Sequence, residues 1–213
     1  MRILITGFEP FGGDSVNPSA ELVWALNAAP PPGIDLAAAI LPCAFAVLPG
    51  ALEAAVARHE PDILLGFGLA TGRPGLSVER IAINIIDARI PDNEGAQPLD
   101  EPVIKGGPAA YFSTIPIKSI FARLNDAGIP AAVSQTAGTF VCNAMMYRAL
   151  HLADRHPPLR AGFIHVPCLP SMPEAQAGAP SLDSAILRDA GKIILETLRD
   201  EPVDRRIFAG TVA

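Results

Sequence analysis

A cysteine, a histidine and a glutamate stand out because of where each one falls in the chain. Cys142 lies in TAGTFVCNAMMY, where a glycine-bearing run gives way to a helical pattern. His165 lies in AGFIHVPCLP, at the end of an apolar stretch, and Glu79 lies in SVERIAINIID. A thiol, an imidazole and a carboxylate together perform nucleophilic catalysis when the fold brings them together.

Cys142 has two interpretations. The partial positive charge at a helix N-terminus lowers a thiol pKa, and a cysteine nucleophile reacts as its thiolate. Free cysteine is also among the most buried residue types, so a packed, inert thiol is the alternative. The residues that follow Cys142 form an apolar helical face, which suits both interpretations.

His165 falls at the predicted carboxyl end of a strand, where α/β proteins place their ligands. A structural histidine in a strand is the alternative. A metal site made by Cys142, His165 and Cys168 is disfavoured, because no close cysteine pair accompanies them. The remaining histidines lie in polar contexts and are expected at the surface: His59, His151 and His156.

Glu79 needs a partner if residues 78–86 form one strand, because it then shares the apolar side of that strand with Ile81 and Ile83. A carboxylate on an apolar face is costly unless it is paired. It can pair structurally with Arg80 or Arg89, or it can orient an imidazole.

Two glycine-rich stretches superficially suggest phosphate binding. GFEPFGGDS has no lysine after its glycines and an acid where an anion would bind. GFGLATGR places its third glycine one position late for a dinucleotide motif. We therefore expect turns at strand ends rather than nucleotide sites. Phe8 and Phe11 flank the first turn, either as packing residues or as the wall of a small apolar pocket.

Composition restricts the class of protein. The chain has 213 residues, which suits one domain, and its net charge of −6 argues against a nucleic-acid partner. The apolar run at the N-terminus is too short for a signal peptide, and no segment approaches the roughly 20 apolar residues of a membrane span. An odd number of widely spaced cysteines fits a reducing, cytoplasmic compartment: Cys43, Cys142 and Cys168.

Strand-like and helical patterns alternate, which predicts a single-domain α/β protein with three α/β/α layers around a mostly parallel, mixed central sheet. Residues 87–111 are predicted to form a long loop, and 201–213 a loose C-terminal tail. The predicted strands are 1–6, 35–41, 62–67, 78–86, 131–134 and 162–166. The predicted helices are 17–27, 47–59, 116–127, 142–155 and 181–200.

With these residues in view, the chain resembles the type I pyroglutamyl peptidases, also called pyrrolidone carboxyl peptidases. The matching segments are LITGFEPFGGDSVNPS, ERIAINIIDARIPDNEG, GGPAAYF, TAGTFVCNAMMY and GFIHVPCLP, and the resemblance weakens after about Pro180. It implies a cytosolic cysteine peptidase that removes an N-terminal pyroglutamyl residue from peptides without a metal or cofactor. It also implies peptides with a blocked N-terminus as partners, and a homodimer or homotetramer.

The resemblance assigns a role to each matched residue. Cys142 would be the nucleophile, His165 the base and Glu79 the acid that orients the imidazole. Arg89 matches a family arginine near the oxyanion. The pocket for the flat lactam ring would be lined by Phe8, Phe11, Phe140 and Val141.

Leu69 departs from the family pattern, which carries glutamine beside the substrate pocket at this position. Loss of an amide there removes a hydrogen bond unless only the backbone contacts the lactam. Two alternatives therefore stay open: an amidase for another small N-acyl or cyclic amide, and a catalytically silent binding protein on the same scaffold. The loop from Asp87 to Tyr111 would gate the site or carry a subunit contact.

Overall fold

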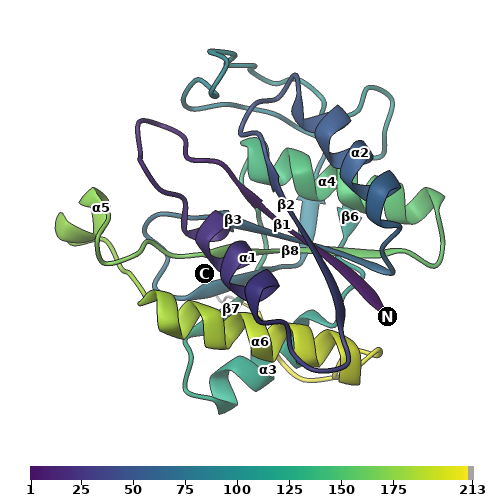
Figure 1. Cartoon of the computed structure of the whole chain (residues 1–213). Helices are drawn as coiled ribbons and strands as arrows, with labels where there is room; N and C mark the ends of the chain where they lie inside the picture. The colour runs from purple at the N-terminus through teal and green to yellow at the C-terminus, as the bar shows by residue number, and fades with distance from the viewer. Residues whose placement is uncertain (211–213) are drawn as a thin grey trace.

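The computed structural model describes residues 1–210, built around a six-stranded sheet in the order β2-β1-β3-β8-β4-β7 (Figure 1). Four neighbouring strands run parallel, and β4 pairs antiparallel with β8 and parallel with β7. The sheet is therefore mixed, as predicted. Its strands are β1 (Arg2–Phe8), β2 (Asp35–Leu41), β3 (Ile63–Leu69), β4 (Leu76–Glu79), β7 (Ala131–Ser134) and β8 (Arg160–Val166).

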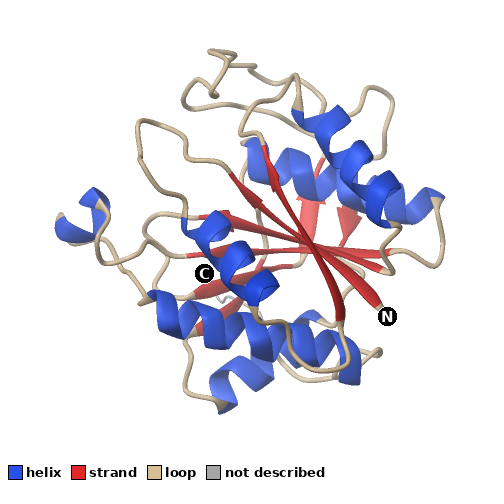
Figure 2. Cartoon of the chain, in the orientation of Figure 1, coloured by secondary structure: helices blue, strands red, loops and turns tan. Residues whose placement is uncertain are grey.

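Helices cover both faces of this sheet (Figures 1 and 2). One face packs against α1 (Pro18–Ala28), α3 (Ile117–Asp126) and α6 (Ser184–Asp200). The other packs against α2 (Leu48–His59) and α4 (Val141–Arg155). Because each face has its own apolar core, the predicted three-layer α/β/α architecture is confirmed.

The chain itself explains why β3 lies in the middle. Every residue of β3 is buried, which is the pattern of a strand covered on both faces. The start of α1 follows equally local rules: the Asn17 side chain accepts a hydrogen bond from the backbone N–H of Ser19, and Pro18 occupies the first helical position.

The prediction of a single strand over residues 78–86 is wrong. The main-sheet strand β4 ends at Glu79, and β5 (Ile81–Ile83) pairs with β6 (Ala110–Phe112) in a separate two-stranded sheet. The chain changes sheets at Arg80, whose backbone N–H donates to Ser134 and whose carbonyl accepts from Ser113. Hence Glu79 does not share a strand face with the isoleucines that follow it.

Two short elements were not predicted: β6, which overlaps the end of the expected loop, and α5 (Pro173–Gln176). Most of 87–111 does lack helix or strand, but hydrogen bonds organise it. The buried Asp92 carboxylate accepts from the backbone N–H groups of Phe45, Glu94 and Ala96 at 2.7–2.9 Å. This part of the loop is thereby tied to the segment that precedes α2.

The predicted C-terminal tail is described as far as residue 210, and 211–213 lie outside the described residues. Residues 201–210 contain no helix or strand. They are nevertheless attached, because the Asp204 carboxylate accepts from the backbone N–H groups of Lys118 and Ser119 at the start of α3, and Ala209 is buried.

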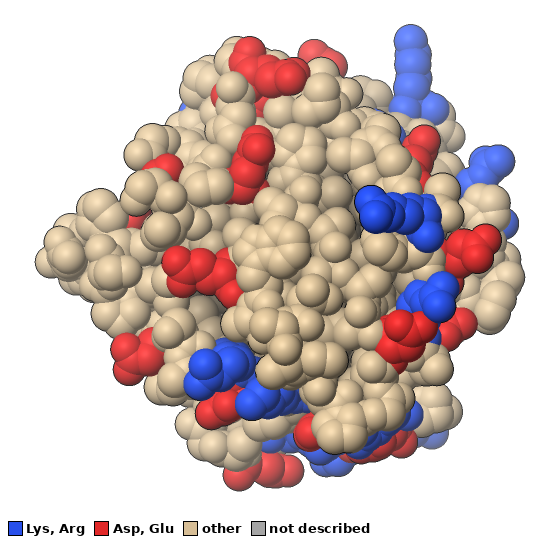
Figure 3. All heavy atoms as spheres, viewed as in Figure 1, with Lys and Arg blue, Asp and Glu red and all other residues tan. Residues whose placement is uncertain are grey.

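Acidic and basic side chains are interspersed over the face in Figure 3 rather than gathered into a basic stripe. Within residues 1–210 no helix is both long enough and apolar enough to cross a bilayer.

Candidate active site

His165 and Glu79 are hydrogen-bonded at the centre of the sheet, with 2.8 Å between Nδ1 of His165 and Oε1 of Glu79. The antiparallel register places Ser77 opposite His165, so Glu79 is its diagonal neighbour on the same face. The two side chains are 5% and 0% exposed. A carboxylate acceptor fixes the proton on Nδ1, which leaves Nε2 unprotonated as a base.

Cys142 is the second residue of α4, and its sulfur lies directly over β3. A Cβ atom built on Gly68 would approach Cys142 Sγ to 2.8 Å. Gly68 is paired in register with His165, and neighbouring strands lie about 4.8 Å apart. The thiol therefore sits over the strand next to the imidazole.

The glycines of GFGLATGR are thus explained by close packing, which corrects the expectation of turns alone. Gly66 and Gly68 lie inside β3, where a side chain would collide with Phe163 and with Met145 or Cys142 of α4. Only Gly72 lies in a turn, with a φ of 89°.

Asn143 anchors the helix that carries the thiol, a role that the sequence did not reveal. Its side chain is fully buried and accepts from the backbone N–H of Ile83 at 3.0 Å. Its amide group donates to the carbonyls of Ile83 and Ile85. The first turn of α4 is thereby fixed to β5 and the residues after it.

The N–H groups at the start of α4 remain available to a ligand. Phe140 is the N-cap residue and makes no side-chain capping bond. The first amide with a helical partner is that of Ala144, which donates to the Phe140 carbonyl. The preceding N–H groups are the orphan donors of a helix N-terminus, which favour negative charge.

Arg73 is the second partner of Glu79 and was also missed. Its Nη1 lies 2.5 Å from Glu79 Oε1. The predicted partners Arg80 and Arg89 do not fill this role. Arg80 donates instead to the Ala209 carbonyl, and the exposed side chain of Arg89 makes no hydrogen bond or ion pair with any described residue.

One cavity of about 430 Å³ brings most of the predicted site residues together. Cys142 and His165 open into it, as do Arg73 and Arg89. Its other lining residues are Phe11, Leu69, Ala70, Thr71, Asp87, Ile90, Ala137, Gly138, Thr139 and Phe140.

Aromatic rings form part of the wall. Phe140 packs against Phe11 with ring centres 6.1 Å apart, and against Phe45 in an edge-on contact at 5.3 Å. Two expected pocket residues lie elsewhere: Phe8 is buried and packs against the Phe163 ring, and Val141 is completely buried. Neither is among the residues that line the cavity.

Burial governs the protonation of the thiol and imidazole. It raises the pKa of Cys142 above its ordinary value, although the residue's own backbone N–H and the Arg73 charge act in the opposite direction. It lowers the pKa of His165, although the bond to Glu79 acts against this. Both shifts favour a neutral thiol and a neutral imidazole over an ion pair, whereas the helix start alone favours a thiolate.

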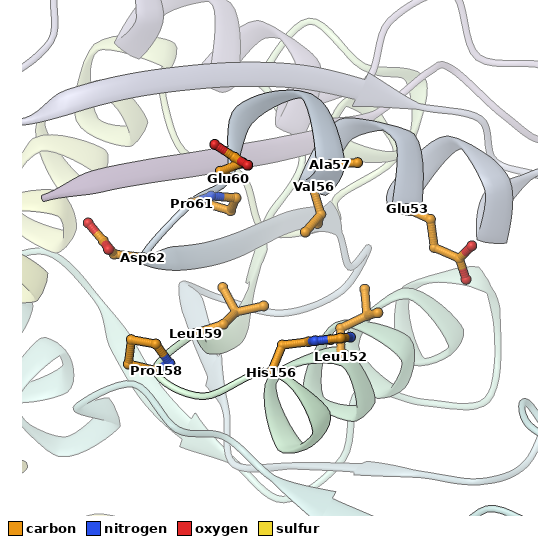
Figure 4. A pocket seen from close by; sticks show the side chains of 10 residues that line it. All are labelled: Glu53, Val56, Ala57, Glu60, Pro61, Asp62, Leu152, His156, Pro158 and Leu159. Carbon is orange, nitrogen blue, oxygen red and sulfur yellow. The ribbon is translucent and has the colours of Figure 1, made fainter.

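A second cavity lies at the opposite end of β3 and β8, between the C-terminal ends of α2 and α4 (Figure 4). Its volume is about 670 Å³, and its floor is apolar, with Glu53, Glu60, Asp62 and His156 among its lining residues. It contains no thiol. Across residues 1–210, no cluster of three or more His, Cys, Asp or Glu side chains is arranged to hold a metal ion.

Taken together, the geometry defines an α/β/α protein with a cysteine–histidine–glutamate site beside a partly apolar cavity. Residues 1–200 match the family model described as pyroglutamyl peptidase, and the chain belongs to this family. The match extends to residue 200, beyond Pro180, after which the chain shows none of the family motifs quoted above.

Curated relatives and solved structures agree with this assignment. The chain is 48% identical over 208 residues to the pyrrolidone-carboxylate peptidase of Klebsiella pneumoniae, covering 98% of this chain and 97% of the relative. The Streptomyces coelicolor protein of the same name is 49% identical, with 96% and 94% covered. The crystal structure of Bacillus amyloliquefaciens pyroglutamyl peptidase I superposes with a TM-score of 0.92 at 44% identity, covering 96% of this chain and 99% of that one.

Proposed function

We propose that this protein is a cysteine peptidase that removes an N-terminal pyroglutamyl residue from peptides, with Cys142 as nucleophile, His165 as base and Glu79 as orienting acid. The observation that carries the proposal is the opening of Cys142 and His165 into one cavity, with His165 bonded to Glu79 at 2.8 Å. Family membership supports it.

In the first step, Nε2 of His165 removes the thiol proton while Sγ of Cys142 attacks the carbonyl carbon that follows the lactam ring. A carbon–sulfur bond forms, and the carbonyl electron pair moves onto oxygen. The orphan N–H groups at the start of α4 stabilise this oxyanion, assisted by the unpaired cation of Arg89 in the same cavity.

In the second step, the imidazolium gives its proton to the leaving amine, and the carbon–nitrogen bond breaks to leave a thioester. A water molecule, deprotonated by His165, then attacks the thioester carbon. Pyroglutamate leaves, and the proton returns to the thiol. Glu79 keeps Nδ1 protonated throughout, so that Nε2 is always the nitrogen that exchanges protons.

The lactam ring is flat and carries no charge, which suits a slot with apolar walls. Phe11, Leu69 and Phe140 supply those walls. We assign Phe8 and Val141, the first residue of α4, to the support of the slot from behind, since both are buried in the core on this face of the sheet. Leu69 adds apolar surface but no side-chain hydrogen bond, so other groups of the cavity, backbone or side chain, bind the lactam N–H and C=O.

A reducing cytoplasmic location and a homo-oligomeric state complete the proposal. Cys43, Cys142 and Cys168 are all free, which fits a reducing compartment. Large apolar side chains are exposed on Trp24, Phe112 and Phe208, and they provide surface that a second copy of the chain would cover. One domain carries the whole activity.

The test compares three fluorogenic amides: pyroglutamyl, prolyl and acetyl-aminoacyl. We expect hydrolysis of the pyroglutamyl amide with a kcat/KM at least tenfold above the other two, and none in Cys142→Ala. Preference for an analogue would instead favour an amidase of different specificity. No turnover of any of the three amides by the folded protein would favour a silent binding protein.

A further inference from the structure

The guanidinium of Arg73 connects three parts of the chain that surround the thiol and imidazole. Nη1 lies 2.5 Å from Glu79 Oε1 and 3.3 Å from the hydroxyl oxygen of Ser134. Nη2 donates to the backbone carbonyl of Thr136 at 2.9 Å. Arg73 follows β3, whereas its partners follow or end β4 and β7.

Glu79 depends on this contact because its carboxylate is completely buried. A buried carboxylate is costly unless charged or polar donors satisfy it. Its Oε1 atom accepts from His165 and Arg73, and its Oε2 atom is buried without a partner among the described residues. Arg73 is therefore the one arginine or lysine in residues 1–210 that pairs with this carboxylate.

We infer that Arg73 is a positioning residue: it fixes the Glu79 carboxylate and thereby holds His165 in the orientation and charge state that proton transfer from Cys142 needs. The inference rests on the proposed function of this site. Arg73 is not assigned a contact with the reacting atoms.

Burial is the main reason that the imidazole of His165 remains a free base, and the charge of Arg73 acts in the same direction. Alone, the Glu79 carboxylate would favour the imidazolium and raise the pKa of His165. Arg73 offsets that charge and lowers the pKa of His165. Charged and titratable groups face His165 from every adjoining element: Glu79 of β4, Arg73, Cys142 of α4, and Asp87 and Arg89 across the cavity.

The Nη2 atom of Arg73 also connects this residue to the segment that carries the nucleophile Cys142. Thr136 begins the segment that leads into α4, and its hydroxyl accepts from the backbone N–H of Gly138. Arg73 therefore bonds both to Glu79, which orients His165, and to the Thr136 carbonyl, in the segment that precedes Cys142. Loss of Arg73 therefore disturbs both partners of the proton transfer.

The experiment uses Arg73→Met, Arg73→Lys and the matched control Arg80→Met in the full chain. Arg80 is next to Glu79 in sequence, but its guanidinium bonds to Ala209 instead. We expect Arg73→Met to lower kcat at least tenfold with a smaller change in KM, and to move the acidic limb of kcat/KM to higher pH. Arg73→Lys should recover part of both effects, and Arg80→Met should match the native protein.

Two readouts do not depend on peptide hydrolysis. In ¹⁵N-histidine NMR, the buried His165 should titrate at higher pH in Arg73→Met than in the native protein, and its Nδ1–H resonance should weaken. Alkylation of Cys142 by iodoacetamide should shift along the pH axis in the same variant. If the native protein does not hydrolyse the pyroglutamyl amide but these shifts occur, the proposed function fails and the positioning role stands.

Native-like kcat, pH profile and His165 titration in folded Arg73→Met would overturn the inference. Circular dichroism monitors folding. If Arg73→Met does not fold, Arg73→Lys becomes the decisive variant. Lysine keeps the positive charge but cannot bond to Glu79 and Thr136 at the same time as the planar guanidinium does. A native-like kcat and a native-like His165 resonance in Arg73→Lys would then also overturn the inference.

Discussion

The sulfur of Cys142 occupies the space that a side chain on Gly68 would need, with 2.8 Å between Sγ and the position of a Cβ atom on that glycine. Gly68 is also the register partner of His165 on the neighbouring strand. One missing side chain therefore lets α4 lower the thiol onto the sheet beside the imidazole.

Gly68→Ala should impair both activity and stability. The added methyl group meets Cys142 and the Phe163 ring, and overpacking a core costs about 1–3 kcal/mol. We expect kcat to fall by at least tenfold as the thiol is displaced. The control is Gly50→Ala in α2, where a Cβ meets nothing within 4 Å, and which should leave activity unchanged and stability equal or higher. Native kcat in Gly68→Ala would contradict this explanation of the thiol's placement.

Glu79→Gln should leave the fold largely intact but reduce kcat by about a hundredfold or more, because an amide no longer enforces the Nδ1–H tautomer of His165. Steady-state kinetics with the pyroglutamyl amide measures the effect. Glu174→Gln, on the short helix α5, serves as the control because Glu174 lies outside the cavity. A loss below threefold in Glu79→Gln would remove Glu79 from the proposed machinery.

The pH–rate profile should be broad. The pKa of His165 is lowered by burial, so the imidazole becomes a free base below its ordinary value of 6.5, and the acidic limb of kcat/KM should lie below that pH. The pKa of Cys142 is raised above its ordinary value of 9.0, so the basic limb should lie above pH 9. A narrow bell-shaped profile of kcat/KM against pH, centred near pH 6, would instead indicate a thiolate–imidazolium pair in the free enzyme.

The same imidazole couples stability to pH. Because the pKa of His165 is lower in the folded state, the unfolded chain binds its proton more readily at acid pH. Stability should therefore decrease as pH falls through about 6.5, the unfolded value, and this contribution should vanish in His165→Gln. Urea denaturation between pH 7.5 and pH 5, measured for both proteins, tests the sign. Equal slopes of stability against pH would contradict it.

Asn143→Leu should destabilise the start of α4. Three hydrogen bonds to Ile83 and Ile85 are lost, and their partly buried backbone groups are left without partners, at up to about 1–3 kcal/mol for each unsatisfied group. Thermal unfolding measures the loss. Kinetics at a temperature where the variant is folded should show a lower kcat, and an unchanged melting temperature would show that Asn143 does not anchor the helix.

Sequence patterns predicted the elements that local chemistry determines. Asn17 and Pro18 mark the start of α1, and the unbroken apolar run of β3 marks a central strand, so both were predicted nearly to the residue. The split at Arg80 was missed because it depends on pairing with Ser113 and Ser134, which are distant in sequence.

Only those residues of the candidate site that lie in recognisable motifs were predicted from the sequence. The resemblance assigned Cys142, His165 and Glu79, but Arg73 was not recognised in GFGLATGR, a stretch considered for phosphate binding, for turns and for the departure at Leu69. Its role appears only when the turn after β3 meets the end of β4. The role of Asn143 was missed for the same reason, because its hydrogen-bond partners belong to β5 and the residues after it, about 60 positions away in the sequence.

The proposed mechanism requires a covalent bond between the sulfur of Cys142 and the pyroglutamyl carbonyl carbon. Acid quenching during turnover of a pyroglutamyl ester, followed by peptide mapping with mass spectrometry, detects this bond. We expect a pyroglutamyl group on the peptide that contains Cys142, absent from Cys142→Ala and from unreacted protein. Steady turnover by Cys142→Ala, or an adduct on Cys43 or Cys168 instead, would contradict it.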